Sequence, residues 1–428
     1  MAHHHHHHHA AHATRRGFLR VLIPGSVFAT RALAQQPADQ AESFRRRSEE
    51  FEAKGLAEPF KGLTANGEVA PGLFPIRSTG VSTESVRQAA ERFLSSLTAE
   101  QRTRACFPVD APEWRKWMNQ HFYVRQGVSL KEMTGAQRDL AFGLLQSAMS
   151  VRGFELTRDI MRLNETLAEL TGDREFLGEW LYYFTMMGTP SATEPWGFQL
   201  DGHHAIVNYF VLGDQVVMTP HFAGSEPVAA TSGKYAGTII LQREQDHGLA
   251  MVQGLTANQM QQAVLRFSKT GNDNLTEAFK DNVVLDYAGI PVRQLAGGQK
   301  KQLLELTALF VGNMDDGHAR VKMQEVERHL DATRFAWIGG TEPDGVFYYR
   351  IHSPVVLIEF DHQRPANLRA QAQAPDKPTR QHIHVVVRTP NGNDYGKDLL
   401  RQHYATHKHD ATGRHSVPGI PVAALARQ

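Results

Sequence analysis

Two closely spaced histidines have the arrangement that could bind a metal ion. His382 and His384 are separated by one residue and open the apolar run Val385–Val387. Alternate side chains of a strand point to the same face, so both imidazoles lie on one side with their backbones about 6.5–7 Å apart. Two neutral imidazole nitrogens at that spacing can meet one ion at about 2.0–2.1 Å. The alternative is that they are hydrogen-bonded polar residues on a hydrated sheet face.

A second pair, His203 and His204, follows Asp201 and Gly202. We expect this pair at the head of a strand, where His203 and His204 point to opposite faces. The face of His204 also carries Asn208 and is the more polar one. His204 is therefore the favoured metal ligand, and His203 is the second choice.

Acidic residues could complete the site. Glu359 and Asp361 share a face at the end of the apolar strand Val355–Phe360. A carboxylate on such a strand must be paired, hydrogen-bonded or metal-bound, because burying it alone is too costly. We predict Glu359 as a metal ligand and Asp361 as a general base. Glu194, in the loop 188–197, is the other candidate acid or base, unless it is bonded to backbone amides.

The chemistry of this set suggests three functions. Two or three histidines with one carboxylate are a frequent donor set for catalytic zinc, iron or copper. The first hypothesis is a metal-activated water that attacks an ester, amide or lactone, with Arg350 or Arg388 holding an anionic small-molecule substrate. The second is oxidation chemistry at iron or copper. The alternative from another class is a non-catalytic periplasmic protein that holds a small ligand with Trp196 and Trp337.

The N-terminal residues predict export. Thr14-Arg15-Arg16-Gly17-Phe18-Leu19-Arg20 matches the twin-arginine pattern, and a short apolar core and Ala32-Leu33-Ala34 follow. Residues 1–34 are therefore expected to be a signal peptide, and the run His3–His9 is either native or a purification tag. The twin-arginine machinery exports folded proteins, so we expect a periplasmic or secreted protein. Such proteins often carry a cofactor that was inserted in the cytoplasm.

Composition excludes several classes. The 428 residues are 41% hydrophobic and 21% charged, as in soluble globular proteins. Lys and Arg total 46 against 45 Asp and Glu, which gives no excess charge to attract nucleic acid. The single cysteine, Cys106, excludes an internal disulfide and a zinc ribbon. No apolar run beyond the leader is long enough to insert into a membrane after cleavage, and no nucleophile-elbow, H-E-x-x-H, P-loop or Rossmann motif is present.

The elements that must position these residues are helices first, then strands mixed with helices. Apolar periodicity predicts helices within 39–54, 82–97, 130–170, 239–252, 260–267, 299–311, 319–330 and 394–404. It predicts strands at 180–187, 197–212, 216–222, 334–339, 346–352, 355–360 and 382–388. The expected fold is α+β, with an antiparallel sheet, helices packed on one face and a helical N-terminal part. We expect a helix-and-loop extension over 35–82, one α+β domain over 83–404 and an irregular tail over 405–428.

Several strings in this order resemble one bacterial family, the domain-of-unknown-function family 3500 (DUF3500). They are Gly188-Thr189-Pro190-Ser191, Glu194-Pro195-Trp196-Gly197, Leu200–His204, Phe335-Ala336-Trp337, Tyr348–Ile351, Ile358–Asp361, His382-Ile383-His384 and Asp394-Tyr395-Gly396. The resemblance covers roughly residues 83–404. It implies that the chain is exported, as members of the family often are, and it implies no particular reaction.

Overall fold

The computed structural model describes residues 26–407, with side chains from residue 38 onward. The chain divides into two units, Met1–Arg46 and Arg47–Gln428. In the first unit the described residues belong to helix α1 (Ser26–Gly55), which runs on into the second. The predicted export motif Thr14–Arg20 lies outside the described residues, as do residues 408–428 of the predicted tail. Among the described residues, no helix has the length and apolarity needed to span a membrane.

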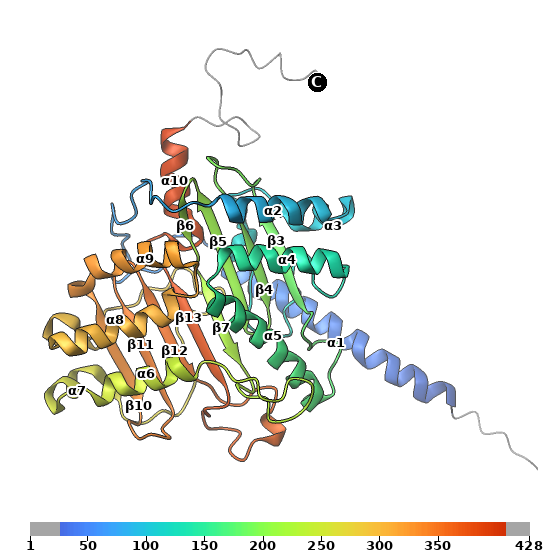
Figure 1. Ribbon diagram of the computed structural model, residues 1–428. Coiled ribbons are helices and arrows are strands. Elements are labelled where there is room, and N and C mark those ends of the chain that lie inside the picture. Colours follow the sequence, from blue (N-terminus) through green and yellow to red (C-terminus); the bar gives the residue numbers. More distant parts are fainter. Residues whose placement is uncertain (1–25, 408–428) are drawn as a thin grey trace, which may run out of the picture. The chain divides into compact units, whose positions relative to one another are not determined.

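A single mixed sheet organises the second unit (Figure 1). Its path through the described residues is β1-β3-β4-β5-β7-β13-β12-β11-β10-β8, and β2, β6 and β9 pair with β3, β5 and β10. Neighbours are antiparallel except for β1 with β3 and β8 with β10. The strands are β1 (Cys106–Phe107), β2 (Val128–Ser129), β3 (Tyr182–Met187), β4 (Trp196–Gly202), β5 (Ala205–Leu212), β6 (Gln215–Val217), β7 (His221–Ser225), β8 (Val264–Arg266), β9 (Ile290–Pro291), β10 (Arg334–Gly339), β11 (Phe347–His352), β12 (Leu357–His362) and β13 (Ile383–Arg388).

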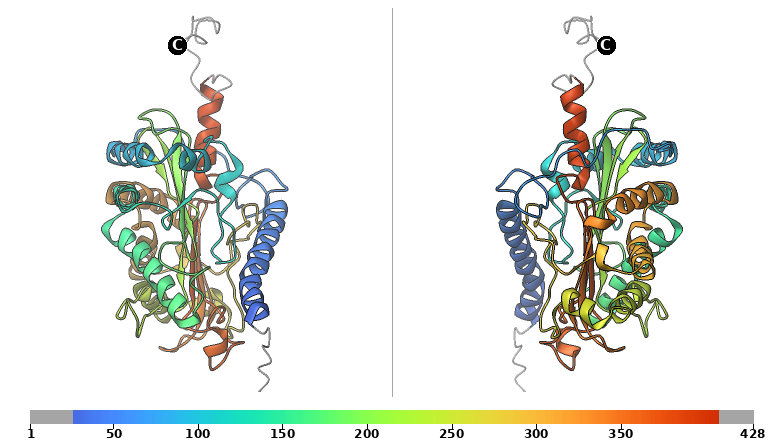
Figure 2. Two further views of the ribbon diagram at one scale, coloured as in Figure 1. Left: turned by 90° about the vertical axis from the view of Figure 1, so that its right-hand side faces the viewer. Right: turned by 90° about the vertical axis from the view of Figure 1, so that its left-hand side faces the viewer.

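Helices cover one face of this sheet, which confirms the predicted α+β class. Seen edge-on, the helices between α2 and α9 lie on the same side of the strands (Figure 2). They bury a large apolar cluster against the sheet. The helices are α2 (Glu84–Ser96), α3 (Ala99–Ala105), α4 (Gly135–Ala148), α5 (Val151–Thr171), α6 (Gln242–Gln253), α7 (Ala257–Ala263), α8 (Gly297–Val311), α9 (Asp316–Arg328) and, near the C-terminus, α10 (Lys397–Thr406).

The two faces of the sheet differ in chemistry because side chains alternate along each strand. The helix-covered face is apolar, and Tyr349 and Phe360 stack on it with ring centroids 5.0 Å apart. The opposite face carries polar residues in register, with Tyr348 opposite Asp361 and Asp361 opposite His384. Irregular segments, rather than helices, supply the hydrogen bonds on this face. Acids and imidazoles from several strands thus collect under loops.

Three predicted elements differ from the structure. The predicted helix 260–267 is α7 only as far as Ala263, and Val264–Arg266 form β8. The predicted strand 197–212 is a hairpin, in which β4 and β5 are joined by the two-residue turn His203-His204. The turn contains none of the Gly, Asn or Asp residues that usually mark such hairpins. The apolar periodicity therefore predicted one continuous strand instead of two. The long predicted helix breaks at Ser150, whose side chain caps α5 by accepting a hydrogen bond from the N–H of Gly153. Gly153 lies in the first turn of α5, where its missing side chain lets the backbone of Asn313 approach closely.

Candidate metal centre

Three histidine side chains meet at one buried point. The Nε2 atom of His204 lies 3.1 Å from that of His384 and 3.3 Å from that of His382. The Nε2 atoms of His382 and His384 are 3.1 Å apart. All three residues are buried, with 4–5% of their surface exposed. The predicted His382–His384 pair and the preferred member of the second pair therefore form one group, called here the histidine triad.

The dimensions of the histidine triad fit a transition-metal ion. Two nitrogens bound to a tetrahedral ion at about 2.0–2.1 Å are about 3.3–3.4 Å apart. The observed separations of 3.1–3.3 Å are slightly shorter. The three imidazoles could therefore hold one such ion together, and a tetrahedral ion held by three histidines would have one position left for a further ligand.

Hydrogen bonds to the other ring nitrogens fix the tautomers of two triad members. The Nδ1 atom of His382 donates to the carbonyl oxygen of Arg364 at 2.7 Å. The Nδ1 atom of His384 donates to a carboxylate oxygen of Glu277 at 2.7 Å. Both partners can only accept, so each neutral imidazole carries its proton on Nδ1 and its lone pair on Nε2. Lone pairs only 3.1 Å apart repel one another unless a cation or a proton lies between them.

Burial keeps two members of the triad in the metal-binding form. Burial, reinforced by the neighbouring imidazoles, lowers the pKa of His204 and His382 well below the usual 6.5. Both rings are therefore neutral near pH 7, the form that ligates metals. Burial alone would raise the pKa of Glu277, but its interaction with His384 and the hydrogen bonds it accepts from His384, Asn274 and Asn119 outweigh burial and lower that pKa. Glu277 remains a carboxylate behind its imidazole.

The hairpin turn delivers His204 to the triad. Its backbone is left-handed, with φ of 64°. Such a conformation is uncommon outside glycine, and it is held here by the surroundings. The N–H of His204 bonds the carbonyl of Asn119, and its own carbonyl accepts from Gly224. Gly224 on β7 lies directly opposite His384 on the neighbouring strand β13. A Cβ on Gly224 would lie 2.5 Å from the carbonyl oxygen of Ile383.

His203 supports the triad from beside it. Its ring stacks on that of His204 with centroids 4.0 Å apart. Its Nδ1 atom lies 2.8 Å from the side-chain oxygen of Asn164 on α5. The second-choice ligand is therefore outside the group of ligand atoms, and its ring holds that of His204 in place.

An irregular segment over 269–281 supplies Glu277. Two strand carboxylates bind this segment through consecutive backbone amides. Asp361 accepts from the N–H groups of Asp273 and Asn274 at 2.7 and 3.2 Å. Glu359 accepts from those of Leu275 and Thr276 at 2.9 and 3.0 Å. The next residue along the chain is Glu277, so the two acids fix the residue that orients His384.

A family model described as a protein of unknown function (DUF3500) matches residues 79–397. The chain belongs to this family. The match spans well over half of the chain and includes all three triad histidines and Glu277. No curated protein and no solved structure matches this DUF3500 protein.

Two acids predicted for the metal site, Glu359 and Asp361, have other bonding partners in this DUF3500 protein. Both oxygens of Glu359 are taken by the 269–281 segment, and the hydroxyl of Tyr348 also donates to it at 2.7 Å. Glu359 is outside the group of potential ligand atoms. Asp361 pairs with the buried ammonium of Lys269 at 2.6 Å. The predicted ligand and the predicted base therefore satisfy backbone amides and a lysine, which is the other way to bury a carboxylate.

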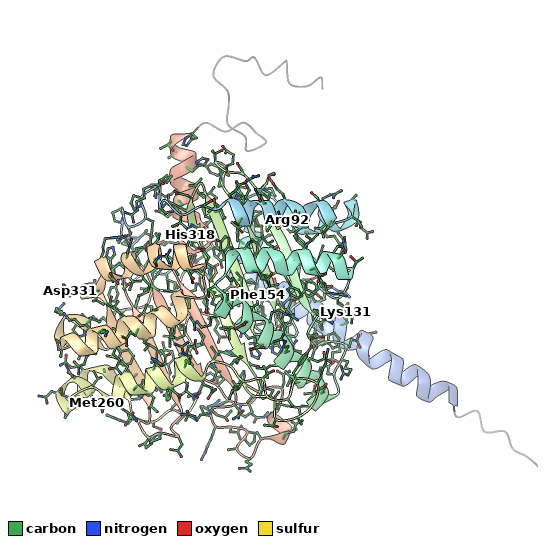
Figure 3. The ribbon with its side chains drawn as sticks, viewed as in Figure 1. Arg92, Lys131, Phe154, Met260, His318 and Asp331 are labelled. Carbon is green, nitrogen blue, oxygen red and sulfur yellow. The ribbon has the colours of Figure 1, made fainter. Side chains whose placement is uncertain are left out.

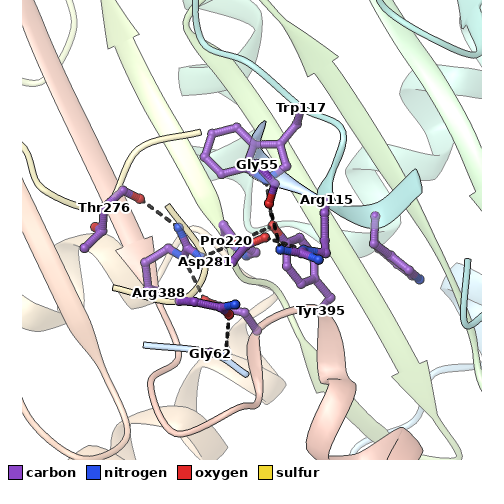
Figure 4. A network of polar contacts seen from close by, with 12 residues as sticks. Gly55, Gly62, Arg115, Trp117, Pro220, Thr276, Asp281, Arg388 and Tyr395 are labelled. Carbon is purple, nitrogen blue, oxygen red and sulfur yellow. Dashed lines mark hydrogen bonds and ion pairs between the residues drawn. The ribbon is translucent and has the colours of Figure 1, made fainter. Parts of the chain in front are cut away.

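Arg388 belongs to a buried network rather than to a substrate site (Figure 4). Its guanidinium bonds Asp281 and Asp394 at 2.7 Å each and the carbonyl oxygen of Thr276 at 2.7 Å. Arg115 donates to the second oxygen of Asp281 at 2.7 Å. This network fixes the C-terminal end of the 269–281 segment to β13. Arg350, the other predicted anion-binding residue, is 3% exposed and reaches the carbonyl oxygen of Asp286 at 3.4 Å.

The remaining candidates lie away from the triad. Glu194 approaches His403 on α10, with 3.6 Å between Oε2 and Nε2. The indoles of Trp196 and Trp337 are fully buried in the core, so neither offers a surface to a ligand. Sequence reasoning missed Glu277 altogether. The segment around it has neither strand nor helix periodicity, and Gly271, Asn272 and Asp273 are residue types that are typical of a loop.

Proposed function

We propose that this protein binds one divalent transition-metal ion at His204, His382 and His384. We further propose that it uses the ion to hydrolyse an ester, amide or lactone bond. The observation that carries the proposal is the convergence of three Nε2 atoms within 3.1–3.3 Å, two of them with protons fixed on the far nitrogen. No arrangement of neutral rings satisfies all three nitrogens as well as a cation does.

The donor set favours zinc or copper. With Glu359 bonded elsewhere, the described part of the chain offers three imidazoles and no carboxylate at this point. Three histidines with an open position are typical of hydrolytic zinc, and imidazole also suits copper. The two-histidine, one-carboxylate set of non-haem iron is not assembled among these ligand atoms. Iron is therefore the least favoured of the three metals expected from the sequence.

The residues around the triad have distinct roles in this proposal. When bound, such an ion lowers the pKa of a coordinated water and supplies a nucleophile at neutral pH. Glu277 orients His384 and increases its basicity, as carboxylates behind ligating histidines do. The Glu277 side chain is 24% exposed, against 7% for His384, so it lies on the side of the site that reaches solvent. Asn274 donates to Glu277 at 2.8 Å, and the amide oxygen of Asn274 is buried and has no hydrogen-bond partner among residues 38–407.

A hydrolysis panel tests the proposal. Zinc-loaded protein is assayed against nitrophenyl esters, anilides and small lactones, beside chelator-treated protein and the variants H204A, H382A and H384A. H247A on α6, whose ring bonds its own helix through Arg243, is the matched control. We expect turnover that requires zinc, survives H247A and is lost in all three triad variants. Turnover that persists in those variants, or none on any substrate, would refute the hydrolytic part. Oxygen uptake by copper-loaded protein tests the oxidative alternative.

Export through the twin-arginine pathway forms part of this proposal. The support is the order of the paired arginines, the apolar core and Ala32-Leu33-Ala34. Cell fractionation of the full chain and of the R15K/R16K variant tests it. We expect the parent in the periplasm and the variant in the cytoplasm, and equal distribution would contradict export by this route.

A further inference from the structure

Two adjoining cavities lie where the sheet divides, away from the histidine triad. Strand β5 pairs with β7 through Ala205–Val207 and with β6 through Phe210–Leu212. Strand β13 pairs with β7 as far as His221, beyond which the chain leaves the sheet. The cavities open beside this division, next to α9, on which His318 is labelled in Figure 3.

The outer cavity measures about 250 Å³ and the inner one about 50 Å³. Val217, Lys322 and Asn393 are among the residues that line both. An engineered apolar cavity of about 150 Å³ accommodates benzene, a molecule of six heavy atoms. On that scale the two cavities together hold a ligand of about ten to twelve heavy atoms.

The outer cavity carries unpaired positive charge. Arg77 and Arg328 line it, and neither guanidinium forms an ion pair with any residue from 38 to 407. Lys322 also lines it, with its ammonium 2.8 Å from Glu325 and 2.8 Å from the carbonyl oxygen of Val355. Glu325 is thus neutralised by Lys322, and the two arginines remain to attract an anion.

The inner cavity has a mixed lining, in which polar residues such as Thr219 and Thr389 lie beside apolar ones. Phe310, Met314 and Val387 are among its lining residues. His221 also lines it, is 3% exposed, and has no hydrogen-bond partner for Nδ1 among the described residues. Burial lowers the pKa of His221 to about 4, so its ring is neutral. A buried ring nitrogen without a partner is costly unless a ligand or a water bonds it.

We propose that the two cavities bind a small monocarboxylate whose apolar chain carries a hydrogen-bonding group at its far end. The carboxylate is held at Arg77 and Arg328, the chain lies along Val217, and the far group bonds His221. The lining residues Phe310 and Lys322 place this site among α8 and α9, on the helix-covered side of the sheet. It is therefore independent of the triad.

Calorimetric titration of the full-length protein with octanoate, 8-hydroxyoctanoate and octan-1-ol tests the proposal. We expect one molecule of acid per chain, with the hydroxy acid binding more tightly than octanoate and octanoate more tightly than the alcohol. The R77Q/R328Q variant should lose about tenfold in affinity for both acids. R320Q is the control, since Arg320 is exposed on α9 and does not line the cavity.

A second variant separates binding from folding. V217F places a ring in the space shared by both cavities and should abolish binding while the circular dichroism of the protein is retained. Equal affinity for octanoate and octan-1-ol, unchanged affinity in R77Q/R328Q, or retained binding in V217F would overturn the carboxylate site. Equal affinity for octanoate and 8-hydroxyoctanoate would overturn the role of His221 and indicate that a water bonds it.

Discussion

Replacing Glu277 by glutamine tests whether this carboxylate increases the metal affinity of the histidine triad. The variant keeps an acceptor oxygen within reach of His384 Nδ1, now at 2.7 Å, but removes the negative charge. Loss of a carboxylate behind a ligating histidine lowers metal affinity by about 10–100-fold, or about 1.4–2.7 kcal/mol. The side chain is 24% exposed and lies at the surface of an irregular segment, so we expect E277Q to fold normally.

The assay is a competition titration of zinc against a chromophoric chelator at pH 7.5. E132Q is the matched control, because Glu132 is an exposed acid that pairs only with Arg104 in the described residues and lies far along the chain from the site. Both variants keep the run His3–His9, so any zinc bound there contributes equally. If the affinity of E277Q stays within about twofold of the parent, Glu277 does not tune the site and the reasoning from the tautomers fails.

Three further predictions follow from buried groups. Burial and the charge of Arg350 lower the pKa of His352 from 6.5 to about 3; the unfolded chain therefore takes up the proton first, and stability falls as the pH drops below about 6.5. In H352Q the free energy of unfolding should fall less steeply with decreasing pH, by up to about 1.4 kcal/mol per pH unit, as measured by urea unfolding between pH 7 and pH 4. An unchanged slope would contradict the assignment of this pH dependence to His352. R388M leaves Asp394 buried without its cation and Asp281 with Arg115 alone, so it should cost about 3–5 kcal/mol in the same assay. A loss below about 1 kcal/mol would mean that the network is not structural. G224A forces a Cβ to within 2.5 Å of the Ile383 carbonyl oxygen and 3.3 Å of the His204 ring, so it should lower both stability, by about 1–3 kcal/mol, and zinc affinity; retention of both would show that the turn and β13 adjust freely.

Local spacing was enough to predict the part of the site that lies in one strand. His382 and His384 meet because residues two apart in an extended chain share a face, which is a property of the backbone alone. His204 was chosen for the polarity of its presumed strand face, yet it reaches the triad from a hairpin turn with left-handed backbone. The residue was predicted and the geometry was not, because the turn has no characteristic residue types.

The partners of the buried acids could not be predicted from sequence. The cost of burying a carboxylate predicted that Glu359 and Asp361 would be satisfied, and a metal was one way to do it. Their actual partners are backbone amides of a segment more than 80 residues earlier in the chain. Backbone amides are present at every residue and leave no signal in sequence. Glu277 was missed for the same reason, since its role depends on where that segment is fixed.

The central claim is that the three imidazoles hold one metal ion. The direct measurement is the metal content of the parent and of H382A, both purified without added metal. It is determined by inductively coupled plasma mass spectrometry. Because both proteins share the histidine run at residues 3–9, the difference between them reports the triad alone. The structure predicts a difference close to one equivalent of zinc or copper per chain. Equal metal content in the two proteins would contradict it.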